Sequence, residues 1–241
     1  GGCDSPPHAQ VDTIDPSGYE GNPVYPCFER PTLGDLLDAK SVSWRYYQES
    51  GGPGLWHPYD AIRHIRDGND YLKVVWPSDV VLSQIKSGQL PQVSWVAPSG
   101  ANSDHAGTRS NGGPAWVSSI VNAVGQSQYW NDCAIFVVWD DPGGWYDHVA
   151  PQTFNSYELG FRVPLIVISP YAKSGYVSHT QYEFGSILKF VEDAFQTGSL
   201  KTTDQRANSL NDTFNFNQQP RRFVRIQAPP VRFGGSAPDS D

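Results

Sequence analysis

The segment best equipped for chemistry is Trp139–His148, which reads WDDPGGWYDH. An apolar run, Cys133–Trp139, ends directly in Asp140 and Asp141, and the Pro-Gly-Gly that follows lets the backbone turn sharply. Two adjacent carboxylates repel each other unless a positive charge lies beside them, and a divalent cation is the natural partner of such oxygen ligands. Asp140 and Asp141 are therefore candidate metal ligands. The alternative is that they only end a strand and begin a turn.

A second polar cluster, Ser99–Gly107 (SGANSDHAG), follows another short apolar run, Val93–Ala97. Ligands of open α/β sheets bind at the carboxyl ends of strands, so this cluster and the Asp pair are expected to share one crevice. His105 could hold a phosphoryl oxygen or donate a proton to a leaving group; the alternative is a loop histidine hydrogen-bonded to Asp104.

A third candidate is His148, which follows Asp147 at the end of the first segment. The chemistry open to His105 is also open to His148. Its alternative role is structural, namely to orient the loop that carries the two aspartates.

The elements that must position these loops follow from hydrophobic spacing and capping residues. Near-continuous apolar runs are typical of strands covered on both faces, and their alternation with helices predicts an α/β sandwich with a largely parallel sheet. Pro-rich residues 1–30 are expected to be irregular. The expected strands are Ser43–Tyr47, Val93–Ala97, Cys133–Trp139 and Val163–Ser169; the expected helices run from the Thr32 cap to Lys40, from the Ser78 cap to Gly88, from Pro114 to Val124 and over Ile187–Phe195.

Composition narrows the classes of protein. The 241 residues allow one large domain, and 38% hydrophobic residues with eight Trp indicate a folded chain. A net charge of −8 makes the chain a poor candidate for binding nucleic acid, and no apolar run is long enough to span a membrane. A disulfide between Cys3 and Cys27 would close a Pro/Gly-rich loop and imply an oxidising compartment, whereas Cys133 is expected to be an inert core residue.

Four segments in order carry a family resemblance: VSWVAPSGANSDHAG, AIFVVWDDPGGWYDHVAPQ, LGFRVPLIVISPYAKSGYVSH and FGSILKFVEDAF. Over about Thr32–Phe216 the chain resembles the phosphoesterase family of bacterial phospholipases C and acid phosphatases, in the alkaline-phosphatase-like superfamily. The resemblance implies a three-layer α/β/α sandwich and a metal-dependent hydrolase that cleaves a phosphomonoester or a phospholipid. It also implies secretion or a periplasmic location.

The resemblance also assigns roles to the candidate residues. Asp140 and Asp141 match the metal-binding pair, and His105 matches the active-site histidine of the Ser-Asp-His-Ala-Gly loop, with Asp104 beside it expected to contact the substrate. His148, in the Asp-His-Val element, is a further catalytic candidate. The cofactor implied is a divalent metal ion.

Two family features do not occur in this sequence. Family members begin with a strand that leads to a Glu-Asn metal-binding motif, and they carry a Ser or Thr nucleophile; no Glu-Asn pair is present here, and no Ser or Thr lies in that context. We therefore expect residues 1–216 to be the C-terminal part of a single phosphoesterase domain that lacks its N-terminal part and pairs with it. Residues 217–241 are expected to form a Pro/Arg-rich tail.

A rival interpretation is a non-catalytic binding domain for lipid head groups or sugars. Its evidence is a set of aromatic residues in Ser43–Tyr47 and in the loop that follows, which suit such ligands: Trp44, Tyr46, Tyr47, Trp56 and Tyr59. Metal content distinguishes the two interpretations.

Overall fold

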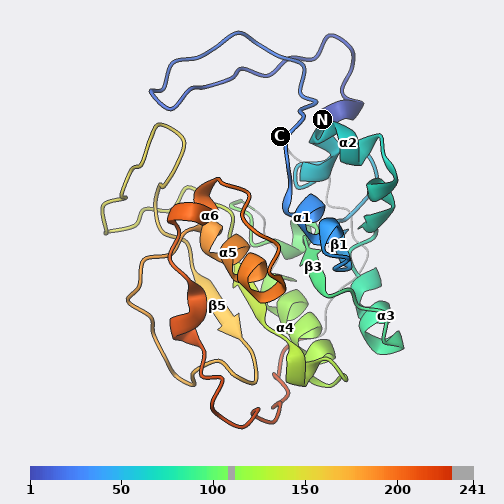
Figure 1. Ribbon diagram of the computed structural model, residues 1–241, viewed down its shortest axis with the longest axis vertical. Helices are drawn as coiled ribbons and strands as arrows, with labels where there is room; N and C mark the ends of the chain where they lie inside the picture. The colour runs from blue at the N-terminus through green and yellow to red at the C-terminus, as the bar shows by residue number, and fades with distance from the viewer. Residues whose placement is uncertain (108–111, 230–241) are drawn as a thin grey trace.

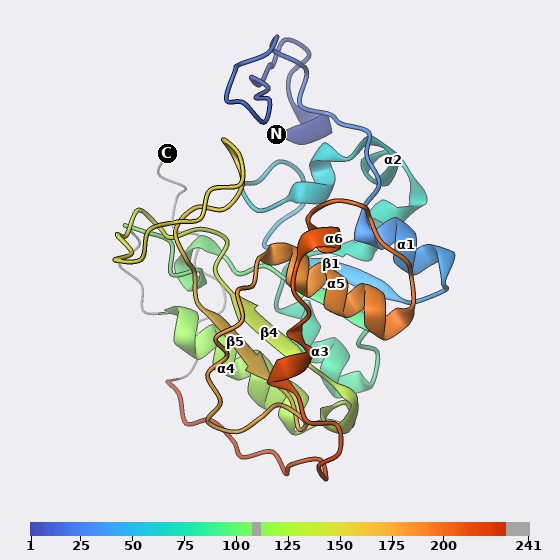
Figure 2. The ribbon, with the colours of Figure 1, turned by 60° about the vertical axis from the view of Figure 1, so that its left-hand side comes forward.

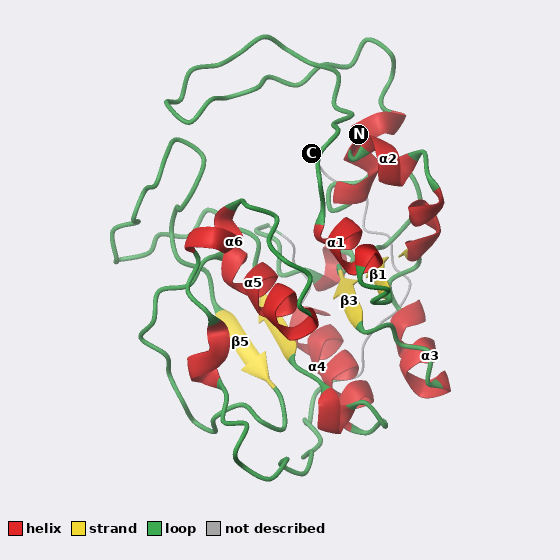
Figure 3. Cartoon of the chain, in the orientation of Figure 1, coloured by secondary structure: helices red, strands yellow, loops and turns green. Residues whose placement is uncertain are grey.

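A computed structural model describes residues 1–107 and 112–229 and shows short helices and strands joined by long loops (Figures 1 and 3). The strands are β1 (Trp44–Tyr47), β2 (Val74–Val75), β3 (Val93–Val96), β4 (Ile135–Val138) and β5 (Leu165–Ile168). The helices are α1 (Leu33–Ala39), α2 (Arg63–Arg66), α3 (Val80–Ser87), α4 (Gly112–Gly125), α5 (Phe184–Phe195) and α6 (Thr203–Arg206).

The first three strands form a parallel sheet in the order β2-β1-β3. Trp44 of β1 lies opposite Val93 of β3, and the register continues to Tyr47 opposite Val96. Helices intervene between these strands along the chain, as parallel pairing requires. This part of the predicted parallel sheet is confirmed.

The last two strands depart from the expected parallel arrangement. β4 and β5 pair antiparallel, with Ile135 opposite Ile168, and form a separate two-stranded sheet among the described residues. The physical reason is the connection, because residues 139–164 contain no helix to carry the chain back for a parallel crossover. The two strands are also less covered than their apolar runs predicted, since Val138 and Ile166 keep 37% and 48% of their surface exposed.

Two hydrophobic clusters occupy opposite faces of the parallel sheet. Successive side chains of a strand point to opposite faces: Trp44 belongs to the cluster packed by α1 and α5, whereas Tyr47 belongs to the cluster packed by α3 and α4. In β2, Val74 belongs to the first of these clusters and Val75 to the second. The sheet is therefore flanked by helices on both faces, as the predicted three-layer α/β/α sandwich requires (Figure 2).

Helix α1 begins where the sequence predicted. The Thr32 hydroxyl accepts the backbone N–H of Asp35, and the Asp35 carboxylate accepts the backbone N–H of Thr32, so the two residues form a reciprocal cap. Helix α3 begins one residue later than predicted: its N-cap is Asp79 rather than the predicted Ser78, which is buried. Gly88 ends α3 in the left-handed conformation, with φ of 74°.

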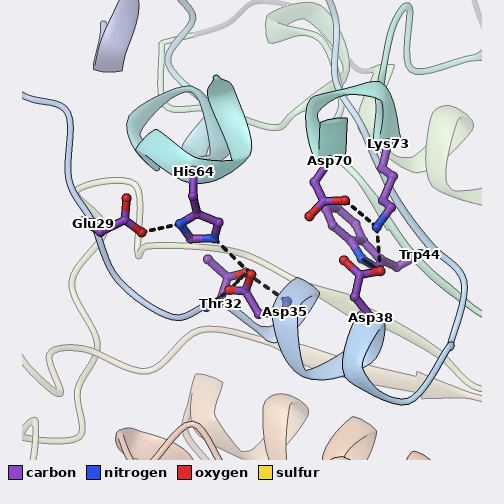
Figure 4. Close-up of polar contacts among 8 residues, drawn as sticks. All are labelled: Glu29, Thr32, Asp35, Asp38, Trp44, His64, Asp70 and Lys73. Atoms are coloured by element: carbon purple, nitrogen blue, oxygen red, sulfur yellow. Dashed lines mark hydrogen bonds and ion pairs between the residues drawn. The ribbon is translucent and has the colours of Figure 1, made fainter. Parts of the chain in front are cut away.

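Polar contacts hold α1 against neighbouring loops (Figure 4). His64 of α2 lies between two carboxylates, with Nε2 3.0 Å from Asp35 Oδ1 and Nδ1 against Glu29. At the other end of α1, Asp38 accepts a hydrogen bond of 3.1 Å from the indole of Trp44. Its ion pair with Lys73 completes the attachment.

The N-terminal residues form an arm that extends away from the sheets (Figure 1). A disulfide joins Cys3 to Cys27, which confirms that predicted pairing. Cys133 has a free thiol and is half-buried rather than fully buried. Near the tip of the arm, the carbonyl of Asp15 accepts a hydrogen bond of 2.8 Å from the hydroxyl of Ser156, so the arm contacts the loop between β4 and β5.

The described part of the predicted tail is attached to the fold. Trp130 donates a hydrogen bond of 2.7 Å to the carbonyl of Arg221, and Ile226 donates one of 2.8 Å to Asn122 of α4. Residues 230–241, the rest of the predicted tail, lie outside the described residues.

Candidate functional site

A cavity of about 1630 Å³ is lined by β3, by β4 and by the loops that follow both strands. All five residues singled out from the sequence line it: Asp104, His105, Asp140, Asp141 and His148. The two loops that carry them also approach each other. A Cβ built on Gly143 would lie 3.7 Å from Cβ of Ala106. The predicted common crevice is therefore present, whereas the roles of the five residues stay predictions.

The loop after β3 is shaped by its own hydrogen bonds. Ser103 Oγ donates to the carbonyl of Gly100 at 3.0 Å and accepts the backbone N–H of His105 at 3.1 Å. The His105 ring nitrogen Nδ1 lies 2.9 Å from the carbonyl of Ala106. Because a carbonyl oxygen only accepts hydrogen bonds, Nδ1 carries the proton, and Nε2 is the nitrogen able to gain or lose one. The indole of Trp56 lies beside this ring, 6.1 Å between centroids.

The carboxylate of Asp104 is directed at the start of helix α4. Asp104 adopts a left-handed conformation, with φ of 59°. A Cβ added at Gly113 would come within 2.1 Å of Asp104 Oδ1, so any larger residue there would require the carboxylate to move. A negative charge is favourable beside the amino end of a helix. This placement gives Asp104 a positioning role in the fold, and contact with substrate stays a prediction.

Asp140 and Asp141 make different contacts in the loop after β4. Asp141 Oδ1 accepts the backbone N–H of Gly143 at 2.5 Å. Gly143 and Gly144 both have positive φ, 61° and 76°, a conformation that glycine adopts without steric cost. Asp141 therefore stabilises a tight turn, as the alternative interpretation held, and one of its oxygens is already engaged.

Asp140 acts electrostatically on a residue of the parallel sheet. Burial, reinforced by the negative charge of Asp140, raises the pKa of Tyr46 to about 12. Tyr46 thus stays a neutral phenol at physiological pH, and its hydroxyl donates a hydrogen bond of 2.9 Å to the carbonyl of Trp56. Sequence reasoning placed Tyr46 only among the aromatic residues of the rival interpretation. The signal missed was its position at the carboxyl end of a strand.

Asp147 and His148 lie further along the same loop. Asp147 accepts two hydrogen bonds from the guanidinium of Arg162, at 2.7 and 2.8 Å. Arg162 and the backbone N–H of Val149 hold the pKa of Asp147 far below its usual range. The His148 side chain is 87% exposed, with Nδ1 3.8 Å from Asp147, so it lies at the rim of the cavity. Arg162 is a residue whose role the sequence did not reveal.

Most of the aromatic side chains on which the rival interpretation depended are buried. Trp44, Tyr47 and Tyr59 are buried in the hydrophobic clusters, at 2%, 0% and 8% exposure. Only Tyr46 and Trp56 of the five line the cavity. Three of the five rings are therefore core residues, unable to contact a head group or a sugar.

The resemblance implies a divalent metal ion, which would need several side-chain ligands close together. Asp140 and Asp141 supply carboxylate oxygens, but within residues 1–107 and 112–229 no group of three or more His, Cys, Asp or Glu side chains gathers to hold a metal ion. A divalent cation takes six or more oxygen ligands or a tetrahedral set. The described residues thus fall short of a complete metal site.

Within residues 1–107 and 112–229, no helix has both the length and the apolar character needed to cross a bilayer.

Comparison with known proteins assigns the family. The chain is 26% identical to the "Non-hemolytic phospholipase C" of Burkholderia pseudomallei, over 86% of this chain and 38% of that protein. It is 26% identical to "Phospholipase C B" of Mycobacterium tuberculosis, over 86% of this chain and 49% of that protein. "Non-specific phospholipase C1" of Arabidopsis thaliana is 26% identical, over 85% and 44%. The chain spans less than half the length of these relatives. Residues 8–198 match the Phosphoesterase family, and the chain belongs to that family.

Proposed function

We propose that this chain is part of a phosphoric-ester hydrolase of the phospholipase C type. The observation that carries the proposal is the meeting of the two loops after β3 and β4 in one cavity, which brings His105 and Asp140 to a common space. Family membership and relatives named as phospholipases C support it. An acid phosphatase acting on soluble phosphomonoesters is the alternative within the same reaction class.

In this proposal His105 is the group that transfers a proton. Its Nδ1 is held by the carbonyl of Ala106, so Nε2 can protonate the departing alcohol oxygen or hydrogen-bond a phosphoryl oxygen. Asp104 positions the His105 loop against α4, and Asp147 with Arg162 positions the loop that carries His148 at the rim. The nucleophile is proposed to come from polypeptide outside these residues.

The proposal includes a divalent metal ion. Asp140 and Asp141 would supply carboxylate ligands to it, and the remaining ligands would come from polypeptide outside the described residues. Such a cation would offset the repulsion between two adjacent carboxylates. Its measurable consequence is bound metal in the full-length protein.

Secretion or a periplasmic location is part of the same proposal. The disulfide between Cys3 and Cys27 supports it, because disulfides persist in oxidising compartments and are rare in the cytosol.

The test uses the full-length protein with two substrates, phosphatidylcholine in mixed micelles and p-nitrophenyl phosphate. Release of phosphocholine supports the phospholipase C type, whereas turnover of the monoester alone supports the phosphatase type. The variant His105→Asn should lose about 100-fold or more in turnover. The matched control His179→Asn, at an exposed histidine away from the cavity, should stay at the wild-type rate. Absence of turnover on both substrates by metal-loaded, folded protein would refute the proposal.

A further inference from the structure

We propose that the N-terminal arm, residues 3–27, is a strap that positions the loop between β4 and β5, and that the Cys3–Cys27 disulfide keeps this strap closed. The loop, residues 139–164, lines the cavity with Asp140 and His148 among others. Opening the disulfide should therefore loosen one wall of the cavity while the sheets stay folded. The inference concerns the position of this loop and does not depend on the proposed reaction.

Both ends of the arm are attached to the region of α2. At the amino end, Arg66 of α2 donates two hydrogen bonds of 2.8 Å to the carboxylate of Asp4. Just after the carboxyl end, the backbone N–H of Phe28 donates to the carbonyl of Ala61, and its carbonyl accepts the N–H of Arg63, both at 2.8 Å. The disulfide thus closes the arm at a point that is fixed to the fold.

Between its base and its tip the arm is a two-stranded ribbon with exposed apolar side chains. The backbone N–H groups of Val11 and Val24 each donate to the carbonyl of the other residue, at 2.9 Å. The two side chains keep 40% and 36% of their surface exposed, and Ile14 keeps 48%. A two-stranded ribbon without a buried face is at best marginally stable in water. Its order therefore depends on what holds its base and its tip.

The tip of the arm holds the middle of the loop, and the two segments lie side by side in both views (Figures 1 and 2). Ser156 donates its hydroxyl to the carbonyl of Asp15 at 2.8 Å and its backbone N–H to the carbonyl of Pro16 at 3.3 Å. The tip has its own hydrogen bonds, because Asp15 Oδ1 accepts the backbone N–H groups of Ser17 and Tyr19, at 2.8 and 3.1 Å. Ser156 thus meets two carbonyl groups that a formed turn presents.

On its other side, the middle of the loop is held by Arg206 of α6. The guanidinium pairs with Glu158 of the loop and with Glu183, the N-cap of α5. It also lies over the ring of Phe154, 4.0 Å from the centroid. The loop has no helix or strand of its own between residues 139 and 164. Its middle therefore takes its position from Arg206 on one side and from the arm on the other.

The disulfide is the strongest connection at the base of the arm. The polar contacts that would remain at the amino end include the ion pair of Asp4 with Arg66, whose side chains are 26% and 28% exposed, and the hydrogen bond of 2.7 Å from the Tyr25 hydroxyl to the carbonyl of Ser5. Ion pairs that water reaches contribute little. Once the bond is open, the two strands of the ribbon can separate at the base, and the tip no longer presents its carbonyl groups to Ser156.

Opening the disulfide is a reversible two-electron reduction. A dithiol reductant supplies two electrons and two protons and becomes a disulfide itself, while the Sγ–Sγ bond breaks and Cys3 and Cys27 become thiols. Both cysteines are half-buried, so part of their surface is open to the reagent. The position of the loop should therefore follow the redox state of this pair.

The first test is amide hydrogen exchange of the full-length protein, read at single residues by fragmentation mass spectrometry. In Cys3→Ser/Cys27→Ser, the hydrogen-bonded amides of Phe154 and Ser156 should exchange at least about tenfold faster than in wild type, whereas the amides of β1 should keep their rates. Unchanged exchange at Phe154 and Ser156 would overturn the proposal. Equal acceleration at β1 would also overturn it, because the disulfide would then stabilise the whole fold rather than the loop.

A variant that fails to fold is replaced by the folded wild-type protein, measured before and after reduction with dithiothreitol. The same two amides should exchange faster after reduction and return to their first rates after reoxidation. Exchange that does not change on reduction would overturn the proposal.

The second test works from the loop toward the arm, because coupling between two segments is reciprocal. Ser156→Ala removes the hydroxyl that bonds to Asp15, so the amides of Val11 and Val24 should exchange about threefold faster or more. Ser156→Thr keeps a hydroxyl and should restore the wild-type rates. The matched control is Thr153→Ala, at an exposed hydroxyl in the same loop.

Wild-type exchange of the arm in Ser156→Ala, or equal acceleration in Thr153→Ala, would overturn the assignment of Ser156 as the contact. None of these measurements depends on catalysis, so failure here is distinguishable from failure of the proposed function.

Discussion

Arg162 and Asp147 form a two-pronged ion pair, with Nε and Nη2 of the arginine 2.7 and 2.8 Å from the two carboxylate oxygens. The pair ties the beginning of the long loop between β4 and β5 to its end, just before β5. It therefore determines where His148 lies relative to the cavity.

Breaking this pair should loosen the loop more than it destabilises the protein. The Arg162 side chain is 61% exposed, and exposed ion pairs contribute little to folding stability. We expect Arg162→Gln to increase proteolytic cleavage between residues 139 and 163 while the melting temperature changes little. The control is Arg222→Gln, at an exposed arginine outside that loop. Unchanged cleavage in Arg162→Gln would show that the pair does not order the loop.

Gly113→Ala should displace the His105 loop. The added methyl group would lie 2.1 Å from Asp104 Oδ1, so the carboxylate must leave its place at α4. Turnover of the full-length protein should fall at least tenfold, an order-of-magnitude expectation for a misplaced catalytic group. Gly100→Ala, in the same loop with open space around its Cβ, is the matched control. Equal activity of both variants would contradict this account of Asp104.

The two adjacent aspartates should respond differently to Ala. Asp141→Ala removes the acceptor of the Gly143 N–H and should cost about 1 kcal/mol of folding stability, whereas Asp141→Asn keeps an acceptor oxygen and should restore it. Within the described residues the turn hydrogen bond goes to Asp141 and none of this kind goes to Asp140, so Asp140→Asn and Asp140→Ala should be equally stable. Both Asp140 variants should lower the bound metal measured by mass spectrometry of the full-length protein. Wild-type metal content in Asp140→Ala would exclude that residue as a ligand.

Thiol titration should find one reactive cysteine, and it should react slowly. Cys3 and Cys27 are joined, while burial, reinforced by the charge of Asp132, raises the pKa of Cys133 to about 11. Little thiolate is present at pH 8, so a disulfide reagent should label the folded protein far more slowly than the denatured protein. Cys133→Ala should abolish labelling in both states; three thiols in the unreduced, denatured protein would refute the bridge.

His64 should make stability depend on pH near neutrality. Burial lowers its pKa, but the hydrogen bond with Glu29 and the hydrogen bond and charge of Asp35 outweigh it, so the net pKa is raised. A raised folded-state pKa means that this stabilisation is complete below the unfolded value of about 6.5. It is lost as the pH rises through the folded value.

The measurement is the free energy of unfolding on both sides of neutral pH, for wild type and for His64→Gln. Wild type should lose stability relative to the variant as the pH rises through that range, and His179→Gln should follow wild type. Parallel curves for wild type and His64→Gln would show that the Glu29–His64–Asp35 contacts contribute no pH dependence.

Local features were predictable because local chemistry determines them. The Thr32 and Asp35 cap, the left-handed Gly88 and the turn at Asp141 depend on backbone groups a few residues away. The common cavity of His105 and Asp140 was also predictable, since loops at strand carboxyl ends converge whatever the details of packing.

Only the tertiary structure decided how distant segments meet. It decided that β5 runs antiparallel to β4, that the charge of Asp140 acts on Tyr46, and that Trp44 and Tyr59 belong to the core rather than to a binding surface. Hydrophobic periodicity reports that a strand is covered but not by which neighbour, because burial against any apolar surface yields the same pattern. For that reason the run at β4 predicted a strand covered on both faces, and only the tertiary structure showed that β4 belongs to a two-stranded sheet and keeps Val138 partly exposed.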